Sequence, residues 1–518
     1  MSKQSIRKIV IVGGGTSGWM TGAALVHFFG KQGCEIQLIE SDAIGTVGVG
    51  EATLPHLRFF NQTLGIDEQE FMQATQATYK MGIEFSNWGQ LGDVYIHPFG
   101  DYGRSYNDVG FHHYWTKLKQ MGDTSPIDIY SLPVVAAARN KFAFPSSDER
   151  SILSTYSYAF HLDATLYAKY LRNYSEMRGL VRHEGKVIEV IQSSVDGRIE
   201  KVLLDNGLHV EGDLFIDCSG FRGLLIEQTL KTGYEDWSEY LPCNRAVAIP
   251  CERNGNLLPY TKARAQTSGW QWRIPLQHRT GNGYVYCSDY ISDDEACGSL
   301  LSNLDGKPTA EPNFLRFTTG KRKEAWNKNC VAIGLAGGFL EPLESTSIYL
   351  IQIAITKLIE FFPDKDFDEA TRAEYNRQMD IEYTRVKDFL ILHYHATRRT
   401  DTSFWNRCRT MEIPESLRDK MKLFKERGYV VQYQGGLFLE PSWVAVYLGQ
   451  GVVPSCYDLR VNRISDSDLQ IMMKNIRDLV ARAAADLPLH SDFLQWQREK
   501  LFNACEAPRP SLSLYGSR

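Results

Sequence analysis

Residues 7–18 read Arg-Lys-Ile-Val-Ile-Val-Gly-Gly-Gly-Thr-Ser-Gly (RKIVIVGGGTSG), and this stretch decides the fold. A short apolar run leads into a glycine-rich turn. A helix-compatible run through Phe29 follows, and then a second apolar run, EIQLIE, at 35–40. This pattern predicts a strand, a tight turn, a helix and a second strand. Parallel strands need such a crossover helix, so the pattern indicates an α/β fold.

The glycines of this turn have the spacing of a nucleotide-binding loop. Gly13-x-Gly15-x-x-Gly18 opens the predicted helix, and Glu40 ends the next strand 22 residues after Gly18. Glycines allow a tight turn and the close approach of a pyrophosphate, the helix N-terminus attracts its charge, and the acid can bond ribose hydroxyls. The stretch therefore predicts a dinucleotide site. A glycine-rich turn without a ligand is the alternative.

Further β-rich and strand-turn-helix pieces lie far along the chain. Residues 185–217 contain short β-rich runs separated by Asp196-Gly197 and Asn206-Gly207, which predict hairpins. Residues 331–363 read as an apolar strand, glycines and an amphipathic helix. This split arrangement favours FAD over NAD, because late elements complete the cofactor site in FAD monooxygenase-like folds.

The predicted fold is α/β: an FAD-binding doubly wound fold of the FAD monooxygenase-like type, with a threaded substrate module and a mainly helical C-terminal part. The nucleotide-binding pieces are spread over the first two thirds of the chain, so the FAD module is expected to be discontinuous. The expected boundaries are 1–60, 150–240 and 320–365 for the FAD-binding module, and 61–149, 241–319 and 366–518 for the substrate-binding module.

Composition excludes several classes of protein. The 518 residues have a net charge of −5, so no basic surface for nucleic acid is expected. The sequence has no uncharged apolar run of about 18 residues, the length that could span a membrane. No signal peptide precedes the first strand, and together these features predict a cytoplasmic protein. The 10 cysteines are scattered without a C-x-x-C pair, and His393-Tyr394-His395 lacks further ligands at suitable spacing, so no metal is expected.

The stretch WQWRIP at 270–275 places two of the chain's 10 tryptophans two residues apart, before a proline. Alternate side chains of a strand share one face. Trp270 and Trp272 would then form one aromatic wall. Ordinary packing in a core is the alternative interpretation.

The stretch Glu344-Ser345-Thr346-Ser347 precedes an apolar helix. Serine and threonine are good helix caps, and the first free N–H groups of a helix can bind an anion. Simple capping is one interpretation. The other is that these amides face flavin oxygens or a halide. Because Glu344 would repel a halide, its carboxylate would then turn toward a site where positive charge develops.

Residues 79–85 alternate between apolar and polar side chains. In one continuous strand, Lys80 and Glu84 would share a face opposite the apolar residues. Exposure to solvent is the usual explanation for such a lysine.

Four signatures, in this order, resemble the tryptophan halogenase family of flavin-dependent halogenases over nearly the whole chain. They are Gly13-x-Gly15-x-x-Gly18, Gly50-Glu51-Ala52-Thr53-Leu54-Pro55, Trp270-x-Trp272-x-Ile274-Pro275 and Pro342-Leu343-Glu344-Ser345-Thr346. The resemblance implies an enzyme that takes reduced FAD from a separate flavin reductase. With oxygen and chloride or bromide, it would halogenate an electron-rich aromatic, above all an indole. A homodimer is also implied.

The resemblance also implies residue roles. Lys80 would hold the oxidised halogen beside the substrate, and Glu344 would stabilise the cationic intermediate or remove its proton. Trp270 and Trp272 would keep organic substrate away from the flavin. The implied cofactor contacts are Gly13, Gly15, Ser17, Gly18, Glu40, Ala52, Val187, Leu335 and Ile348. The implied halide site is Thr346 and Ser347, and the implied substrate contacts are His97, Phe99, Ile83 and Trp443.

One segment departs from the family pattern. In the enzymes that act on free tryptophan, paired tyrosines, an acid and a Phe-Trp grip the amino acid, whereas residues 429–451 keep Trp443 but have neither pair. A buried zwitterion needs charged or hydrogen-bonding partners. The gap predicts a more open site. Free indole, a substituted indole or a larger indole-bearing molecule is then expected rather than free tryptophan.

Two other functions are compatible with a flavin site. The first is an FAD-dependent aromatic monooxygenase, which must let its substrate reach the flavin and has no use for a remote lysine. The second is a non-catalytic protein that binds reduced flavin. The combination of WQWRIP, Lys80 and Glu344 argues against both.

Overall fold

In the computed structural model, residues 5–44, 50–433 and 436–501 are described. The N-terminal stretch forms the expected unit, in which β1 (Lys8–Val12) leads through α1 (Thr16–Phe29) to β2 (Glu35–Glu40). β1 pairs in parallel with β2 on one side and with β12 (Leu214–Asp217) on the other. The prediction from the first 40 residues is confirmed.

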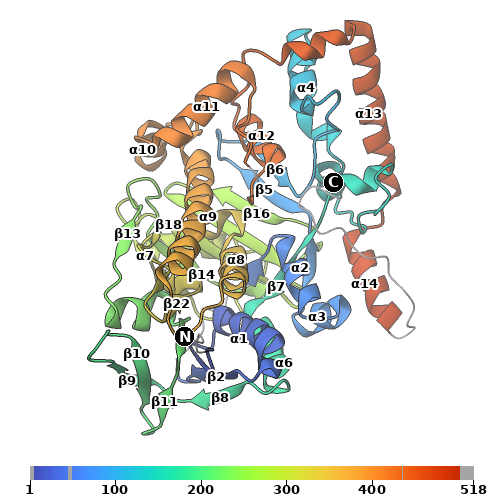
Figure 1. Ribbon diagram of the computed structural model, residues 1–518. Coiled ribbons are helices and arrows are strands. Elements are labelled where there is room, and N and C mark those ends of the chain that lie inside the picture. Colours follow the sequence, from blue (N-terminus) through green and yellow to red (C-terminus); the bar gives the residue numbers. More distant parts are fainter. Residues whose placement is uncertain (1–4, 45–49, 434–435, 502–518) are drawn as a thin grey trace.

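Strands distant in sequence complete this sheet. Its order is β21-β22-β12-β1-β2-β8, with β8 at Val181–Glu184, β21 at Trp326–Asn327 and β22 at Cys330–Ala332. The helices α6 (Ala164–Glu176) and α8 (Ser347–Glu360) both pack on α1 (Figure 1). The predicted hairpins form a separate antiparallel sheet of β9 (Val187–Gln192), β10 (Ile199–Leu204) and β11 (His209–Glu211). The α/β fold class is confirmed.

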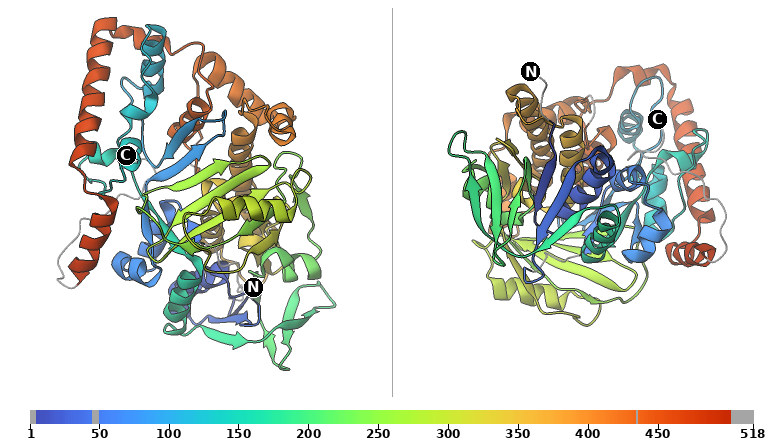
Figure 2. Two further views of the ribbon diagram at one scale, coloured as in Figure 1. Left: turned by 180° about the vertical axis from the view of Figure 1, so that it is seen from behind. Right: turned by 60° about the horizontal axis from the view of Figure 1, so that its bottom comes forward.

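A second, larger sheet, coloured from blue to yellow-green, lies beside the sheet that contains β1 and β2 (Figure 2). Its strand order is β19-β14-β18-β17-β16-β5-β6, and β15 pairs with β18. The bounds are β5 Gly82–Ser86, β6 Val94–Pro98, β14 Arg245–Ala248, β15 Cys251–Glu252, β16 Thr261–Ala265, β17 Gly269–Pro275, β18 Arg279–Tyr286 and β19 Asn313–Arg316. The stretch WQWRIP lies in β17, the middle strand of this order.

The expectation of one strand through residues 79–85 is wrong. β4 (Thr78–Lys80) pairs with β7 (Ala159–Asp163), whereas β5 pairs with β16 and β6. The chain changes sheets at Met81, whose N–H donates to the Pro259 carbonyl at 2.7 Å. Lys80 is consequently fully buried, in contrast to the exposure that its sequence context suggests.

The C-terminal part is helical, as expected. Its helices are α9 (Glu369–His395), α10 (Ser403–Thr410), α11 (Glu415–Arg427), α12 (Glu440–Gly449), α13 (Asp466–Asp486) and α14 (His490–Leu501). The other helices are α2 (His56–Thr63), α3 (Glu68–Ala74), α4 (Phe111–Gln120), α5 (Leu132–Ala138) and α7 (Asp293–Ser302). Short strands occur at β3 (Gly50–Ala52), β13 (Tyr234–Asp236), β20 (Gly320–Arg322) and β23 (Gly338–Phe339). Within the described ranges, none of these helices is long and apolar enough to cross a bilayer.

Candidate functional site

A cavity of about 710 Å³ opens at the carboxyl ends of β1, β2 and β12 and extends to β17. Ligands of open α/β sheets bind at this edge, where the glycine-rich turn begins. The residues predicted to bind the cofactor line this cavity, with the exception of Gly18: they are Gly13, Gly15, Ser17, Glu40, Ala52, Val187, Leu335 and Ile348.

The turn after β1 has no room for a side chain at Gly13 or Gly14. Gly13 has a φ of +118°, and a Cβ on it would lie 2.2 Å from the Cys218 carbonyl oxygen. A Cβ on Gly14 would overlap the carboxylate of Glu40 at 1.5 Å, whereas nothing lies within 4 Å of a Cβ placed on Gly15. The turn thus presents bare backbone to the cavity at the start of α1, which suits a pyrophosphate. Together with the apolar lining, these residues fit FAD, and the cavity of about 710 Å³ is called the flavin-type cavity.

Glu40 lies where an acid is expected to meet the ribose, and its carboxylate already has protein partners. Its Oε1 lies 2.5 Å from Nε of Arg182, and its Oε2 accepts a hydrogen bond from the Trp19 indole at 3.2 Å. Each carboxylate oxygen has further lone pairs, so these bonds orient the group without using up its capacity as an acceptor.

The tryptophans of WQWRIP both line the cavity, with their ring centroids 6.1 Å apart. Trp272 lies against Gly283 of β18, where a Cβ would fall 2.0 Å from the ring. Trp270 donates its indole N–H to Glu341 at 2.9 Å. The predicted strand is confirmed, and the two rings form one wall of the cavity.

Lys80 is fully buried. Its Nζ donates to the Ser345 hydroxyl at 2.7 Å and to the Thr53 carbonyl at 3.0 Å, and it lies 5.0 Å from the centroid of the Phe99 ring. Burial lowers the pKa of Lys80 to about 7, against the opposing charge of Glu344. Ser345 also lines the large cavity, so Lys80 is one residue removed from it.

Glu344, next to Ser345 in the chain, is buried between two histidines. His97 Nδ1 lies 2.8 Å from Oε2, and His393 Nε2 lies 2.8 Å from Oε1. Burial raises the pKa of Glu344, but the facing histidines outweigh this effect and hold the pKa near 2. The group is therefore a carboxylate at neutral pH.

The hydrogen-bond partners of His393 assign a proton within this cluster. Its Nδ1 lies 2.8 Å from the Phe389 carbonyl oxygen, which can only accept, so Nδ1 carries a proton. The other ring nitrogen, Nε2, faces Oε1 of the Glu344 carboxylate at 2.8 Å.

The segment before α8 does not form the expected cap. Thr346 is the first flanking residue of α8, yet its hydroxyl makes no cap hydrogen bond, is buried and has no partner among the described residues. Ser345 has a φ of +59°, a left-handed conformation that is uncommon for serine. This strained backbone turns the Ser345 hydroxyl toward Lys80 and Glu344 away from the cavity.

The expected substrate residues take different positions. Phe99 lies beside Lys80, and His97 hydrogen-bonds Ser442 through Nε2 at 2.8 Å. Ile83 pairs with His97 across β5 and β6. Trp443 packs on Phe389, with centroids 5.1 Å apart, and lines neither of the two cavities described here.

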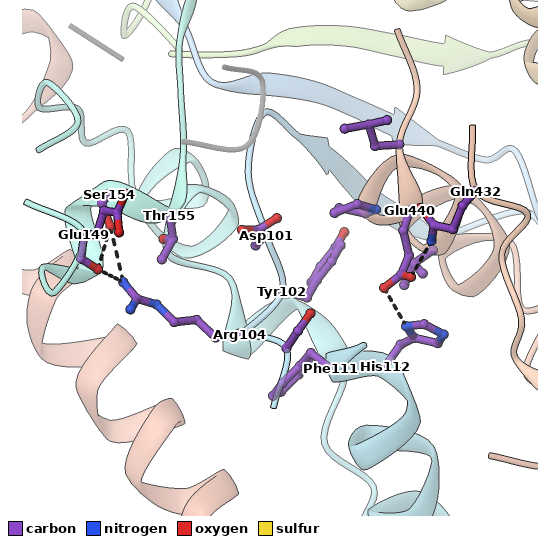
Figure 3. A pocket seen from close by; sticks show the side chains of 15 residues that line it. Asp101, Tyr102, Arg104, Phe111, His112, Glu149, Ser154, Thr155, Gln432 and Glu440 are labelled. Carbon is purple, nitrogen blue, oxygen red and sulfur yellow. Dashed lines mark hydrogen bonds and ion pairs between the residues drawn. The ribbon is translucent and has the colours of Figure 1, made fainter. Parts of the chain in front are cut away.

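A second, polar cavity of about 410 Å³ lies at the N-terminus of α12 (Figure 3). Arg104 reaches the Glu149 carbonyl and the Ser154 hydroxyl along one wall. On the other wall, Glu440 lies between His112 and Gln432. The chain from 101 to 105, which follows Phe99, forms the floor.

Sequence reasoning missed three partners of the site, namely His393, Ser442 and Glu341. His393 belongs to the His-Tyr-His run, which drew attention only as a weak metal motif. Within the described ranges, no three His, Cys, Asp or Glu side chains form a metal-binding cluster. The proximity of His393 to Glu344 depends on α9 crossing the loop after β23, and no spacing in the sequence encodes that crossing.

Comparisons with known proteins agree with this geometry. The family model for tryptophan halogenase matches residues 8–466. The structure of BrvH, a flavin-dependent halogenase from Brevundimonas sp. BAL3, superposes with a TM-score of 0.92 and 46% identity, and covers 95% of this chain and 99% of that one. The tryptophan 6-halogenase SttH from Streptomyces toxytricini superposes with a TM-score of 0.86 and 33% identity, over 95% of this chain and 100% of that one.

A curated relative gives the same assignment from sequence. Tryptophan 6-halogenase ThaL from Streptomyces albogriseolus is 38% identical over 486 residues, which are 87% of this chain and 90% of the relative. The resemblance inferred from the four motifs is thereby confirmed. The chain belongs to the tryptophan halogenase family and is a flavin-dependent halogenase, an enzyme that uses reduced FAD and a halide.

Proposed function

We propose that this enzyme halogenates an indole ring, with Lys80 and Glu344 as its catalytic residues. The observation that carries the proposal is the burial of a lysine with a pKa near 7 between the flavin-type cavity and a buried carboxylate. Perturbed titratable groups that converge in one interior site are typical of catalytic centres. When bound, reduced FAD supplies with oxygen the oxidising equivalent that turns halide into an electrophilic halogen.

The protein's part is to hold and direct that halogen. Lys80 keeps it within reach of the substrate, either as an ammonium that donates a hydrogen bond or as an amine that carries the halogen. The ring carbon forms its bond to the halogen, and the positive charge that develops in the ring faces the Glu344 carboxylate. The ring proton then leaves to this carboxylate, which restores the aromatic system.

The start of α8 is the proposed halide site. Ser347 lines the flavin-type cavity, and the adjoining Thr346 has a buried hydroxyl without a partner among the described residues. The first N–H groups of the 14-residue helix α8 have no partner within the helix and lie at the positive end of its dipole. The carboxylate of Glu344 is engaged by histidines on the other side, so it does not occupy this position.

The enzyme takes its reduced flavin from a separate reductase, because no second nucleotide motif provides a site for a nicotinamide cofactor. The decisive experiment combines the protein with FAD, a flavin reductase, NADH, bromide or chloride, and indole. Halogenated indole is expected, with the isotope pattern of the halogen in its mass spectrum. Flavin turnover without halogenated product would contradict the proposal.

The substrate is proposed to be an indole ring, alone or as part of tryptophan or a tryptophan-like molecule. The expected exclusion of free tryptophan loses support, because ThaL and SttH, which cover most of this chain, are named tryptophan 6-halogenases. The polar cavity at residues 101–105 adjoins Phe99 and offers both Arg104 and Glu440. An amino-acid group has the complementary charges and would lie there.

Comparing indole with L-tryptophan tests this assignment. Both are expected to be halogenated, with the lower KM for L-tryptophan, because its charged groups gain partners in the polar cavity. Arg104→Ala should raise the KM for L-tryptophan and leave that for indole unchanged. Turnover of L-tryptophan with none of indole would show that the amino-acid group is required for catalysis.

The aromatic wall separates this proposal from aromatic hydroxylation. Trp272→Ala removes the ring that lies over Gly283 and should let organic substrate approach the flavin. We expect less halogenated and more hydroxylated indole, measured as masses shifted by one oxygen atom. Trp272→Phe retains an aromatic wall and serves as the control. If Trp272→Ala folds and halogenates as the wild type does, the wall does not act as a barrier.

A further inference from the structure

Glu341 is a second buried carboxyl in the loop that carries Glu344, and the proposed chemistry gives it no role. Its Oε2 accepts two hydrogen bonds, from the Trp270 indole at 2.9 Å and from the Tyr394 hydroxyl at 2.5 Å. The side chain has no exposed surface, and its Oε1 has no partner among the described residues.

The carboxyls of Glu341 and Glu344, which lie in one loop, both contact the same turn of α9. Glu341 precedes the 3₁₀ turn Pro342–Glu344, and its partner Tyr394 directly follows His393, the partner of Glu344. The loop is held a third time by Ser345, which accepts from Lys80. Residues 341–346 are thereby attached to α9, to β4 and to β17.

This loop separates the flavin-type cavity from Lys80. Leu340, Pro342 and Leu343 line the cavity, whereas the carboxyls of Glu341 and Glu344 point to the opposite side. Trp270 lies between the cavity and Glu341, because its ring lines the cavity while its indole N–H donates a hydrogen bond to Glu341. Glu341 therefore supports the wall from behind and does not contact the cavity.

The buried carboxyl of Glu341 does not favour the stability of the folded protein. Burial raises the pKa of Glu341 to about 7, although the bonds from Tyr394 and Trp270 offset part of this effect. An apolar side chain of similar volume would avoid the desolvation of a carboxyl with one unpartnered oxygen. A buried group kept at that cost is expected where geometry matters for function.

We propose that Glu341 is a positioning residue, which holds Trp270 and Tyr394 together so that the loop 341–346 directs oxidised halogen to Lys80. This inference rests on the proposed role of Lys80. Without the two bonds, Trp270 and the loop lose their common anchor. Oxidised halogen then escapes, and reduced flavin is consumed without halogenating the ring.

The test measures coupling, defined as halogenated indole formed per flavin oxidised, with taurine added to trap escaping hypohalous acid as a haloamine. Glu341→Leu should lower coupling by about tenfold, because small displacements of a positioned group cost catalysis heavily. Taurine haloamine should rise in step, while the rate of flavin oxidation and the affinity for FAD stay within about twofold. Glu341→Gln, which keeps an acceptor oxygen for Trp270 and Tyr394, should restore most of the coupling.

A matched control and a second variant keep the test decisive. Glu235→Gln alters another indole–carboxylate bond, to Trp237 at 2.8 Å, outside this loop and should leave coupling unchanged. Should Glu341→Leu fail to fold, Tyr394→Phe removes one of the two bonds and must lower coupling. Full coupling in Glu341→Leu or in Tyr394→Phe, or equally poor coupling in the Gln and Leu variants, overturns the inference. Lys80→Ala is assayed in parallel, and persistent halogenation there would instead contradict the proposed function.

Discussion

Lys80→Ala is expected to abolish ring halogenation while oxidation of reduced flavin continues. The Nζ atom is the only part of Lys80 that hydrogen-bonds Ser345 and Thr53, and truncation removes it without touching the flavin-type cavity. Confinement of two reactants accounts for rate factors of about 10⁵ or more, so loss of the holding group should reduce turnover below detection. The measurement is halogenated indole by mass spectrometry, alongside flavin absorbance.

Two further variants separate chemistry from packing in this experiment. Lys80→Met keeps most of the side-chain volume and should be as inactive as Lys80→Ala. Lys117→Met removes another largely buried lysine, on α4, which pairs with Asp466 at 2.8 Å and not with the loop, and should retain activity. If Lys80→Met halogenates at a substantial fraction of the wild-type rate, the halogen is not held by Nζ and the proposed mechanism is wrong.

Glu344→Gln is expected to lower the halogenation rate by about 100-fold, the usual effect of removing one electrostatic stabiliser of a charged transition state. The wild-type carboxylate has a pKa near 2, because its two histidines outweigh the effect of burial. It therefore stays ionised and available as a base at neutral pH. The amide is neutral, and its N–H₂ group would also face a histidine nitrogen.

This prediction has a pH signature. Since Glu344 titrates far below neutrality, its ionisation should not shape the wild-type rate between about pH 5 and 9. Glu382→Gln, on α9, changes a carboxylate that bonds Tyr349 at 2.8 Å and is the matched control. An unchanged rate in Glu344→Gln would show that another group stabilises the ring cation and accepts the proton.

The local patterns of the sequence determined much of the fold. A strand, a glycine turn and a helix at residues 8–29 involve only neighbours in the chain, as do the hairpins at 187–211 and the helices after 368. The same holds for Trp270 and Trp272, because strand alternation alone places them on one face. The family resemblance supplied Lys80, which its own surroundings in sequence presented as an exposed residue.

The tertiary structure alone decided how the site is assembled. Lys80 is buried because the chain changes sheets at Met81, and this change depends on pairing with β7 and β16, which are distant in sequence. Glu344 meets His97 and His393, and Glu341 meets Trp270 and Tyr394, because α9 and two sheets converge on one loop. Periodicity in a sequence reports which face a side chain takes on its own element. The charges of buried groups depend on partners that only the folded chain brings within hydrogen-bonding distance.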